Sequence, residues 1–434
     1  MFGFAMTYQN IKGTFDVLPD AARDHSSPVP SSDEWIAAEA KIRAVMTAYR
    51  FGEIRTPIIE PTELIARGVG ELTDIVSKEM FAFTRGDTNY VMRPEVTAPV
   101  VRAYLQHNLG QGGPQKLYYI GPCFRAERPQ KGRYRQFHQF GAEVLGAVSP
   151  SADVEIISLM ISVYSAMGLS DFRLRINSLG DESSRPAYKA ALQDYLRPHY
   201  EKLSETSRSR LEANPLRILD TKDPGEKALL ENAPRISEFL GDESKRHFDD
   251  VRQMLDDLGI AFVEDPFLVR GLDYYTRTAF ELESDKVGAQ SALAGGGRYD
   301  LLATELGAKD SVPAVGFAAG FERLFLALAE EQISLSVRKL PDLFFVARGE
   351  RAHNWVVAHA RQLRDRGVAV DLDLLERSVK AQMREANRQA ARFVAVVGED
   401  ELLSGELVFR NMSTGEELQL STDHVVEEFC SMAL

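Results

Sequence analysis

Apolar positions in the first third of the chain change between helical and strand-like spacing. They recur at helical spacing over residues 33–50, which predicts an amphipathic helix. Glu53–Ile59 is expected to follow as a strand. Two further strands, Lys116–Phe124 and Arg135–Leu145, are separated by Pro129-Gln130-Lys131-Gly132, a sequence typical of an exposed loop. This pair predicts a β-hairpin with a long basic tip.

The pattern changes between residues 181 and about 258, where Glu, Lys, Arg, Ala and Leu dominate and Pro215 and Pro224 interrupt. We expect a mostly helical insertion there. Strand-like, glycine-rich sequence returns over Phe262–Gly297, and the apolar segment Val315–Ala329 is predicted to be a helix. The main core would therefore be assembled from both sides of the insertion.

A second domain is predicted beyond a polar boundary near Glu331–Pro341. Three short apolar runs follow it and alternate with helical patterns, as in βαβ units. These runs are Asp342–Val346, Val368–Leu372 and Phe393–Val397.

Length and composition predict two or three domains. The chain has 434 residues and 44% hydrophobic content, and single cores stop growing at roughly 250–300 residues. We expect an α+β core in residues 1–335, with an antiparallel sheet flanked by helices. A C-terminal α/β domain is expected in residues 336–434.

The composition limits the kinds of partner. A net charge of -13 argues against a protein that coats nucleic acid indiscriminately. Two stretches oppose the overall sign: Arg125–Arg135 has five basic residues against one acid, and Glu376–Arg392 has five against two. An anionic partner is expected at those stretches.

Targeting and metal signals are weak. Met1–Asn10 lacks the pattern of a signal peptide, and no apolar run reaches about 18 residues. Cys123 and Cys430 are too few for a disulfide framework or a four-cysteine zinc site. We expect a soluble cytoplasmic protein with no membrane partner and no metal site of its own.

Arginines are the candidates for nucleotide binding, because the chain has no G-x-x-x-x-G-K-[ST] phosphate loop. The planar guanidinium matches phosphate oxygens two at a time. Arg125, Arg270 and Arg323 each lie among apolar residues. Alternatively, they are arginines at the edge of the core, paired with the nearby acids Glu127, Asp273 and Glu322.

Polar residues in the second hairpin strand suggest a site for a small zwitterion. The two-residue period puts Gln139 and Glu143 on one face and His138 on the other, where a structural role is expected. The face with Gln139 and Glu143 is equally typical of a solvated sheet. Glu95 and Thr97 offer another carboxylate and hydroxyl, although Thr97 could simply cap a helix over residues 98–105.

These segments, in this order, resemble the class II aminoacyl-tRNA synthetases and specifically the histidyl-tRNA synthetase family. The likeness runs from Gly13 to the end of the chain. Glu53–Pro57 resembles the first class motif, which builds the dimer interface, Phe124–Glu143 the second and Gly316–Leu324 the third. Leu268–Thr276 is the specific signature, because it resembles the family's histidine-binding segment.

The resemblance implies which residues bind histidine. Its amino group would be bound by Glu95, Thr97 and Gln139. Its imidazole would be surrounded by Glu143, Tyr275 and Tyr299. The family often has a small residue where this chain has Val96, which is expected to narrow the approach to the amino group.

The resemblance also implies the reaction. Histidine would react with ATP to give histidyl-adenylate and pyrophosphate, with Mg²⁺ on the phosphates, and then pass to the terminal ribose of tRNA(His). Arg125 and Arg323 would hold phosphates, Arg270 would be the catalytic cation, and Glu127 and Tyr134 would lie near ATP.

For tRNA, Arg128 and Gln130 match positions that contact the acceptor end in this family. The tail matches its anticodon-binding domain, where residues 378–392 predict a helix with a basic stripe. The stripe comprises Lys380, Arg384, Arg388 and Arg392. Alternatively, these residues form an ordinary solvated helix face with no binding role.

A homodimer is expected from the first motif. The competing hypothesis is a non-catalytic paralogue that regulates the phosphoribosyltransferase of histidine biosynthesis. Such a paralogue resembles a synthetase with eroded motifs and no tail, whereas Arg270, Tyr275 and Arg323 are all present here. A tRNA sensor within a larger protein would need a further module, and the sequence shows none.

Overall fold

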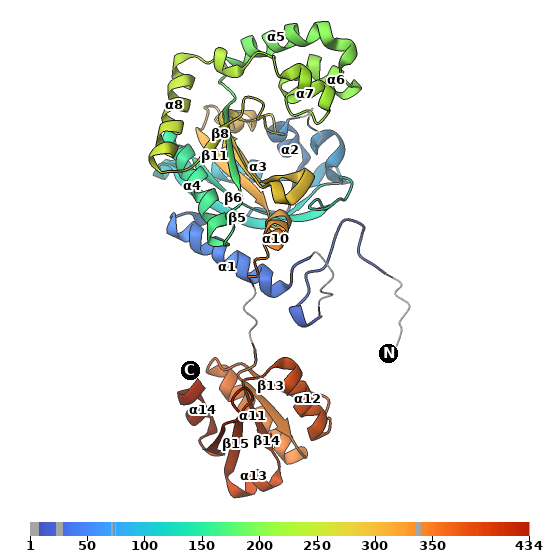
Figure 1. The fold of residues 1–434 in the computed structure, drawn as a ribbon, viewed down its shortest axis with the longest axis vertical. Coiled ribbons are helices and arrows are strands. Elements are labelled where there is room, and N and C mark those ends of the chain that lie inside the picture. Colours follow the sequence, from blue (N-terminus) through green and yellow to red (C-terminus); the bar gives the residue numbers. More distant parts are fainter. Residues whose placement is uncertain (1–7, 23–28, 71–72, 74, 336–339, 434) are drawn as a thin grey trace. The chain divides into compact units, whose positions relative to one another are not determined.

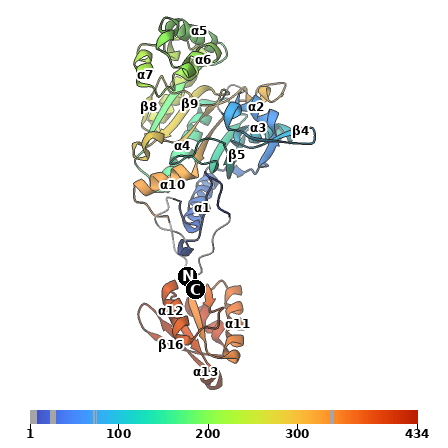
Figure 2. The same cartoon turned by 90° about the vertical axis from the view of Figure 1, so that its right-hand side faces the viewer.

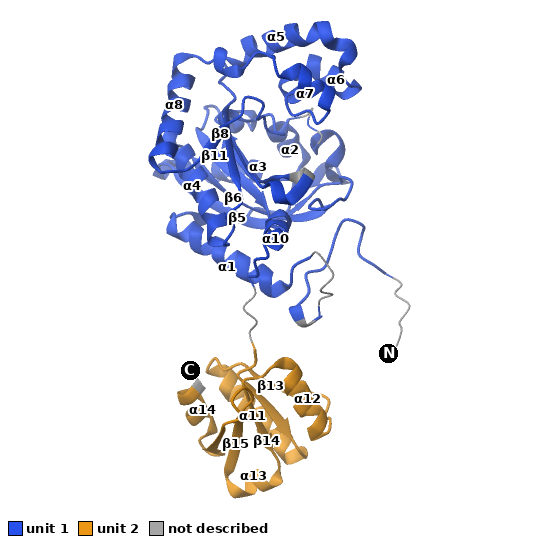
Figure 3. Cartoon of the chain, in the orientation of Figure 1, with its two compact units in different colours: residues 1–336 blue, residues 337–434 orange. Residues whose placement is uncertain are grey.

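The computed structural model describes residues 8–22, 29–70, 73, 75–335 and 340–433. They belong to two compact units, residues 1–336 and 337–434 (Figure 3). Residues 336–339 of the expected boundary lie outside the described residues, as do residues 1–7 of the N-terminal stretch.

Unit 1 is built on an eight-stranded sheet in the order β1-β5-β6-β11-β10-β9-β7-β8 (Figure 1). Neighbouring strands are antiparallel except β1 with β5 and β7 with β8. The strands are β1 Gly52–Glu53, β5 Gln115–Phe124, β6 Gln136–Leu145, β7 Arg173–Ser178, β8 Phe262–Glu264, β9 Thr276–Glu283, β10 Ala292–Arg298 and β11 Ala314–Gly320. The predicted hairpin is confirmed, since β5 and β6 pair along their whole length.

One face of the sheet carries the main hydrophobic core. Phe140 and Ala142 of β6 point to this face, as their two-residue spacing requires, and pack with apolar residues of four helices. These helices are α1 Ser32–Ala48, α4 Pro150–Ala166, α8 Asp242–Asp257 and α10 Phe321–Glu330. A capping box between Ser31 and Glu34 fixes the start of α1.

The opposite face carries a smaller cluster that includes Tyr119, Cys123 and Tyr275. The elements beside it are α2 Thr62–Val69, α3 Thr97–Gln106, α9 Leu302–Glu305 and a three-stranded sheet in the order β2-β4-β3. Its strands are β2 Ile59–Pro61, β3 Phe81–Arg85 and β4 Thr88–Met92. This face holds the candidate site.

The helical insertion predicted from composition is observed between β7 and β8. Besides α8 it contains α5 Arg185–Leu196, α6 Glu205–Ala213 and α7 Pro224–Leu230, joined by short 3-10 turns. Tyr188, Leu192 and Leu230 belong to a hydrophobic cluster of the insertion. In both views α5, α6 and α7 lie at the end of unit 1 opposite α1 (Figures 1 and 2).

Unit 2 is an α/β domain with a five-stranded sheet in the order β13-β12-β14-β15-β16. The elements are β12 Leu343–Ala347, α11 Glu350–Asp365, β13 Val370–Leu372, α12 Val379–Gln389, β14 Phe393–Val397, α13 Glu399–Ser404, β15 Glu406–Asn411, β16 Glu417–Ser421 and α14 Val425–Ala433. The first three strands are parallel, as the βαβ pattern predicted, and the last two add an antiparallel edge. Among the described residues of the chain, no helix has the length and apolar character that a membrane crossing requires.

Three expectations about secondary structure were wrong. Only the ends of Glu53–Ile59 are strand, because the Arg93 guanidinium donates to the carbonyls of Thr56 (2.9 Å) and Pro57 (3.4 Å) where a neighbouring strand would pair. Within Val315–Ala329, residues up to Gly320 form β11. This central strand is largely apolar on both faces, and such a run is hard to distinguish from a buried helix.

The third correction concerns the end of α12. Ala390 has a φ of 55° and ends the helix, so Arg392 lies outside it, next to β14. The helical stripe therefore comprises Lys380, Arg384 and Arg388.

Close packing of β10 against its neighbours generates the first prediction. A β-carbon at Gly296 would lie 2.0 Å from the carbonyl oxygen of Gly316 and 2.7 Å from Cζ of Phe280. Gly296→Ala is therefore expected to destabilise unit 1 by about 1–3 kcal/mol or more, because backbone must move. Urea unfolding followed by circular dichroism measures this change.

Gly52→Ala is the matched control, since a β-carbon at this strand position would meet its nearest neighbour at 3.9 Å. Equal unfolding midpoints for the two variants would contradict the packing argument.

Candidate active site

Three adjoining cavities open on the face of the sheet that carries α3. Their volumes are about 770, 250 and 230 Å³. Arg133, Arg270 and Arg323 line all three, and Arg125 lines the two smaller ones. Four arginines, from three segments far apart in the sequence, therefore meet at one place.

Local contacts fix the position of Arg125 and Arg323. Arg125 follows β5; its Nε donates to the carbonyl of Pro94 at 3.0 Å, and its guanidinium lies 5.1 Å from the ring centre of Phe137. Arg323 stands in the first turn of α10 and donates to the carbonyl of Ala292 at 2.8 Å. Both guanidinium groups are thus held before any ligand arrives.

Arg270 lies across β10 at a position that only glycine permits. A β-carbon at Gly295 would fall 2.2 Å from a terminal nitrogen of Arg270. The guanidinium pairs with Glu281 of β9. Burial alone would lower the pKa of Arg270, yet the charge of Glu281 raises it above its ordinary value. This arginine therefore stays charged within the protein.

The electrostatics of the arginine wall favour an anion. Burial lowers the pKa of Arg323, and the positive charges of Arg133 and Arg125 lower it further. The Nε atom of Arg270 is buried and has no hydrogen-bond partner among the described residues. Phosphate oxygens in the cavity would relieve the repulsion between the arginines.

Glu95 and Thr97 lie at the start of α3 and also line the 250 Å³ cavity. The carboxylate of Glu95 accepts from the backbone N–H groups of Thr97 (2.7 Å) and Ala98 (2.9 Å). The Thr97 hydroxyl donates instead to Glu143 at 2.8 Å. The alternative in which Thr97 caps the helix is therefore wrong, because Glu95 fills that role.

Glu143 lies beneath this cavity and is 1% exposed. It accepts from the hydroxyls of Thr97 and, at 2.5 Å, Tyr299. A β-carbon at Gly316 would fall 1.5 Å from its carboxylate, so the neighbouring strand leaves the space that the side chain needs. Burial raises the pKa of Glu143 to about 8, against the effect of the two hydrogen bonds.

The structure brings most of the predicted ligand-binding residues together. Those that line the 250 Å³ cavity are Glu95, Thr97, Arg125, Glu127, Tyr134, Gln139, Arg270, Tyr275 and Arg323. Glu143 and Tyr299 are not among the described lining residues and form a hydrogen-bonded layer behind them. Val96 is buried in the cluster around Tyr119, also outside that lining, so it does not narrow the approach as expected.

The other predicted residues lie elsewhere. Arg128 and Gln130 are exposed in the loop between β5 and β6, and Lys380, Arg384 and Arg388 are exposed on α12 of unit 2. His138 points to the opposite face of the sheet, as expected, where its ring lies 4.8 Å from that of Trp35.

Two site residues were missed. Arg133 belongs to the basic hairpin stretch, and that stretch was the available signal. Glu281 is the partner of Arg270, but alternation within a strand cannot identify a partner from another segment. The acids that were the alternative partners of the three arginines pair with other residues. Glu127 pairs with Arg133, Asp273 with Arg217, and Glu322 with His138.

Comparison with known proteins identifies the family. The sequence profile described as histidyl-tRNA synthetase matches residues 30–324. The chain belongs to the histidyl-tRNA synthetase family. A second profile, described as anticodon binding domain, matches residues 343–431.

Individual members of the histidyl-tRNA synthetase family are similar over nearly the full length. The histidine–tRNA ligase of Chloroherpeton thalassium is 49% identical over 422 residues, 96% of each chain. Apo histidyl-tRNA synthetase of Staphylococcus aureus has a crystal structure that matches with a TM-score of 0.81 at 40% identity, over 97% of this chain and 99% of its own.

A solved structure from Bacillus halodurans bears on the competing hypothesis. It is described as an ATP phosphoribosyltransferase regulatory subunit/histidyl-tRNA synthetase and matches with a TM-score of 0.63 at 23% identity, over 91% of this chain and 99% of its own. That identity shows a shared fold alone. The full-length likeness to ligases favours the synthetase over the regulatory paralogue.

The buried carboxyl of Glu143 predicts a pH-dependent stability difference. In the unfolded chain the group ionises near pH 4.5, whereas its pKa in the folded protein is about 8. Between these values the folded protein retains a proton that the unfolded chain releases, so stability is lost as pH rises through this window. Across this window, the free energy of unfolding of the wild type is expected to fall, relative to that of Glu143→Gln, by an amount on the order of a few kcal/mol.

Urea unfolding of both proteins between pH 4.5 and 8.5 measures the difference between their free energies of unfolding. If the two pH profiles run parallel, Glu143 ionises in the folded protein as it does in water.

Proposed function

We propose that this enzyme is a histidine–tRNA ligase in which the cavity residues described above act on histidine and ATP. The observation that carries the proposal is the meeting, in one cavity of about 250 Å³, of three arginines expected to act on phosphate with a carboxylate and an amide suited to an amino acid. The arginines are Arg125, Arg270 and Arg323. Glu95 and Gln139 supply the other groups.

We propose that Glu95, Thr97 and Gln139 receive the amino group of histidine. The carboxylate of Glu95 and the side-chain carbonyl of Gln139 match an ammonium ion. Cys123 donates its S–H to the Gln139 carbonyl at 3.3 Å, which fixes the orientation of the amide. One lone pair of that oxygen remains for the ligand.

The imidazole is proposed to meet Tyr275, with Glu143 and Tyr299 behind it. A carboxyl group with a pKa of about 8 can exchange a proton with an imidazole near neutral pH. Rejection of other amino acids then follows, because an apolar side chain would leave these buried polar groups unpaired.

In the first step, a carboxylate oxygen of histidine forms a bond to the α-phosphorus of ATP. The bond from that phosphorus to the bridging oxygen breaks, and pyrophosphate leaves with its electron pair. Negative charge spreads over the phosphoryl oxygens, where Arg270, Arg125 and Arg323 stabilise it. Glu127 and Tyr134, in the same wall, are proposed to lie along ATP.

In the second step, a hydroxyl of the terminal ribose of tRNA(His) attacks the carbonyl carbon of histidyl-adenylate. The ester bond forms, the bond to the phosphate oxygen breaks, and AMP leaves. The hydroxyl proton passes from the attacking oxygen to a phosphate oxygen of the departing AMP, so the products are histidyl-tRNA and AMP.

Mg²⁺ is proposed to arrive on the phosphates of ATP. Among the described residues no group of three or more His, Cys, Asp or Glu side chains is arranged to hold a metal. Mg²⁺ in nucleotide sites usually takes only one or two protein carboxylates and keeps several waters, which fits Glu127 and Glu281 in the cavity wall. Its chemistry would be to neutralise charge on the departing pyrophosphate.

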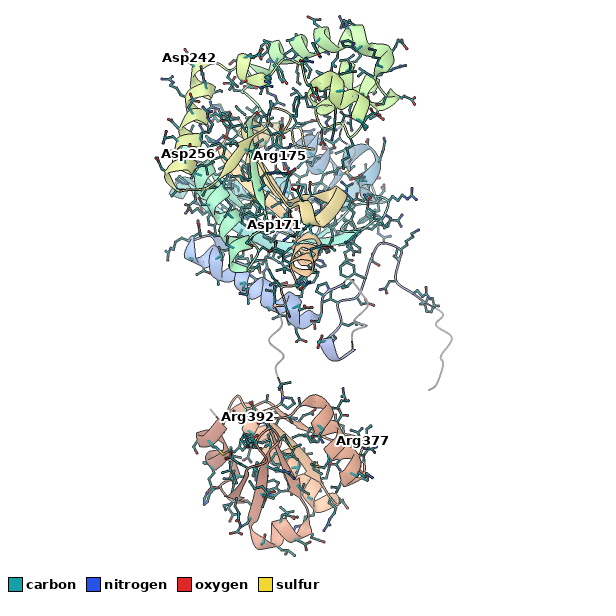
Figure 4. The ribbon with its side chains drawn as sticks, in the orientation of Figure 1. Asp171, Arg175, Asp242, Asp256, Arg377 and Arg392 are labelled. Carbon is teal, nitrogen blue, oxygen red and sulfur yellow. The ribbon has the colours of Figure 1, made fainter. Side chains whose placement is uncertain are left out.

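For tRNA we propose two separate surfaces. Arg128 and Gln130 in the hairpin loop would contact the acceptor end. In unit 2, the exposed cations of α12, Lys380, Arg384 and Arg388, would bind anticodon-arm phosphates. In Figure 4, Arg377 lies beside α12 and Arg392 lies apart from it. This separation agrees with a stripe on α12 that does not include Arg392.

We further propose a cytoplasmic homodimer that pairs through the region of Glu53–Pro57. Large apolar side chains are exposed on the two residues that directly follow that segment and on β3, in the same small sheet as β2. They are Ile58, Ile59, Phe81 and Phe83. A partner subunit would cover this apolar surface.

Histidine-dependent ATP–pyrophosphate exchange tests the proposed function. The wild type is expected to catalyse exchange with histidine and with none of the other amino acids. Arg270→Ala should lower the rate by about 10²–10³, because a preorganised charge at the transition state is lost. The exchange rate of Arg270→Lys should lie between those of the wild type and Arg270→Ala, since lysine keeps the positive charge but lacks the planar guanidinium.

Arg173→Ala is the matched control. Arg173 pairs with Glu283 on β9 at 3.5 Å, as Arg270 pairs with Glu281, but its side chain is half exposed and outside the described lining of the cavities. Its exchange rate should stay within about twofold of the wild type. A folded wild type without exchange would reject the ligase and favour the regulatory paralogue.

The homodimer is tested by light scattering at micromolar concentration. We expect twice the chain mass of 48.4 kDa, and Phe81→Asp should shift the population toward the monomer, because a charge would be buried in the interface. A stable wild-type monomer would refute the homodimer.

A further inference from the structure

The insertion holds the segment between Arg270 and Tyr275 from the edge of the site: Arg217 lines the 230 Å³ cavity, whereas Asp273 is outside the described linings of all three cavities. Arg217, in the insertion, donates from Nε to the carboxylate of Asp273 at 3.1 Å and from a terminal nitrogen to the carbonyl of Gly271 at 3.0 Å. One arginine side chain thus grips both a side chain and the backbone of this segment.

Two other residues of the insertion contact the same segment. The amide of Asn214 donates to the carboxylate of Asp273 at 3.0 Å, and Arg185 of α5 donates to the carbonyl of Tyr275 at 2.9 Å. The insertion therefore binds the segment at three of its residues.

Asp273 is also confined from the side of α2. Its backbone N–H donates to the carbonyl of Val69 at 3.3 Å. A β-carbon at Gly70 would lie 2.7 Å from the Asp273 carboxylate. The aspartate is thus seated between the end of α2 and the insertion.

The confined aspartate lies between two groups of the candidate site. Arg270 precedes it by three residues, Tyr275 follows it by two, and the Arg270 guanidinium lies 6.0 Å from the ring centre of Tyr275. Residues 271–275 belong to no helix or strand. Their conformation depends on such side-chain contacts in place of a hydrogen-bond ladder.

We propose that Arg217 and Asp273 are positioning residues for histidine binding. Their ion pair lets the insertion set the conformation of residues 270–275, so histidine activation depends on the insertion although that step needs no tRNA. This inference rests on the proposed ligase function. It assigns neither residue to contact with the substrate.

The environment of the pair supports an effect larger than that of a surface ion pair. The side chain of Arg217 is 13% exposed and that of Asp273 is 30% exposed. Water screens such a pair only in part, and hydrogen bonds to charged groups are among the stronger ones in proteins.

Steady-state pyrophosphate exchange with Arg217→Met and Asp273→Asn tests the proposal. Each variant is expected to raise the KM for histidine about tenfold, as the loss of one charged hydrogen bond would. The KM for ATP and the kcat should change less. Arg217→Lys, which keeps the charge, should restore part of the affinity.

A double variant separates positioning from general damage. If the two residues act through each other, the combined rise in KM for Arg217→Met with Asp273→Asn stays below the product of the single effects. A merely structural role would lower the concentration of active sites, and hence kcat, with the KM for histidine unchanged.

Arg208→Met is the matched control within the insertion. Arg208, on α6, bonds to Glu201 and to the carbonyls of Tyr200 and Leu203, all inside the insertion. Its KM for histidine should equal that of the wild type.

Hydrogen exchange of the intact protein, followed by mass spectrometry, gives a readout that needs no catalysis. Peptides covering residues 270–275 should exchange faster in Arg217→Met than in the wild type or in Arg208→Met. Wild-type KM for histidine together with wild-type protection of this segment in Arg217→Met would overturn the proposal. Absence of histidine-dependent activity in the wild type would instead reject the ligase, while the exchange comparison would still test the coupling.

Discussion

The candidate site depends on glycines at three positions of β10 and β11. Gly295 leaves the space that Arg270 occupies, Gly297 leaves room for Tyr275, whose ring would lie 2.9 Å from a β-carbon there, and Gly316 leaves room for Glu143. Strands normally gain stability from cross-strand side-chain pairs. Here that gain is given up at three positions, and side chains of the candidate site from other elements fill the space instead.

Burial of charge is the second constraint. A guanidinium removed from water requires a partner, and the protein supplies carboxylates at the edge of the cavity: Glu281 for Arg270 and Glu127 for Arg133. These pairs do not neutralise the whole cluster, since the neighbouring arginines still lower the pKa of Arg323. The remaining positive potential is what would attract a polyphosphate, so the same repulsion that lowers stability favours the ligand.

The sequence predicted those parts of the fold that local patterns determine. One strand of the long hairpin is an apolar run, the other alternates in polarity, and the insertion has helix-forming composition, so both features were found. The central strand β11 was taken for a helix because its apolar residues face protein on both sides. Residue chemistry singled out Arg125, Arg270 and Arg323, yet their partners could not be found, because Glu281 reaches Arg270 only when two segments of the folded chain meet. The contact between Asn214 and Asp273, 59 residues apart in the sequence, has no local signal at all.

The overall charge of the chain and its proposed tRNA partner are compatible because electrostatics acts locally. At physiological salt the Debye length is about 8 Å, so exposed acids farther than this from a bound phosphate contribute little. Near α12, Lys380 and Arg384 are exposed, and the nearby Glu385 is paired with Arg388. A phosphate there meets a basic surface although the chain carries a net charge of -13. The acidic remainder would still oppose nonspecific adhesion to nucleic acid, so affinity for tRNA would come from a few well-placed cations, such as those proposed in the hairpin loop and on α12.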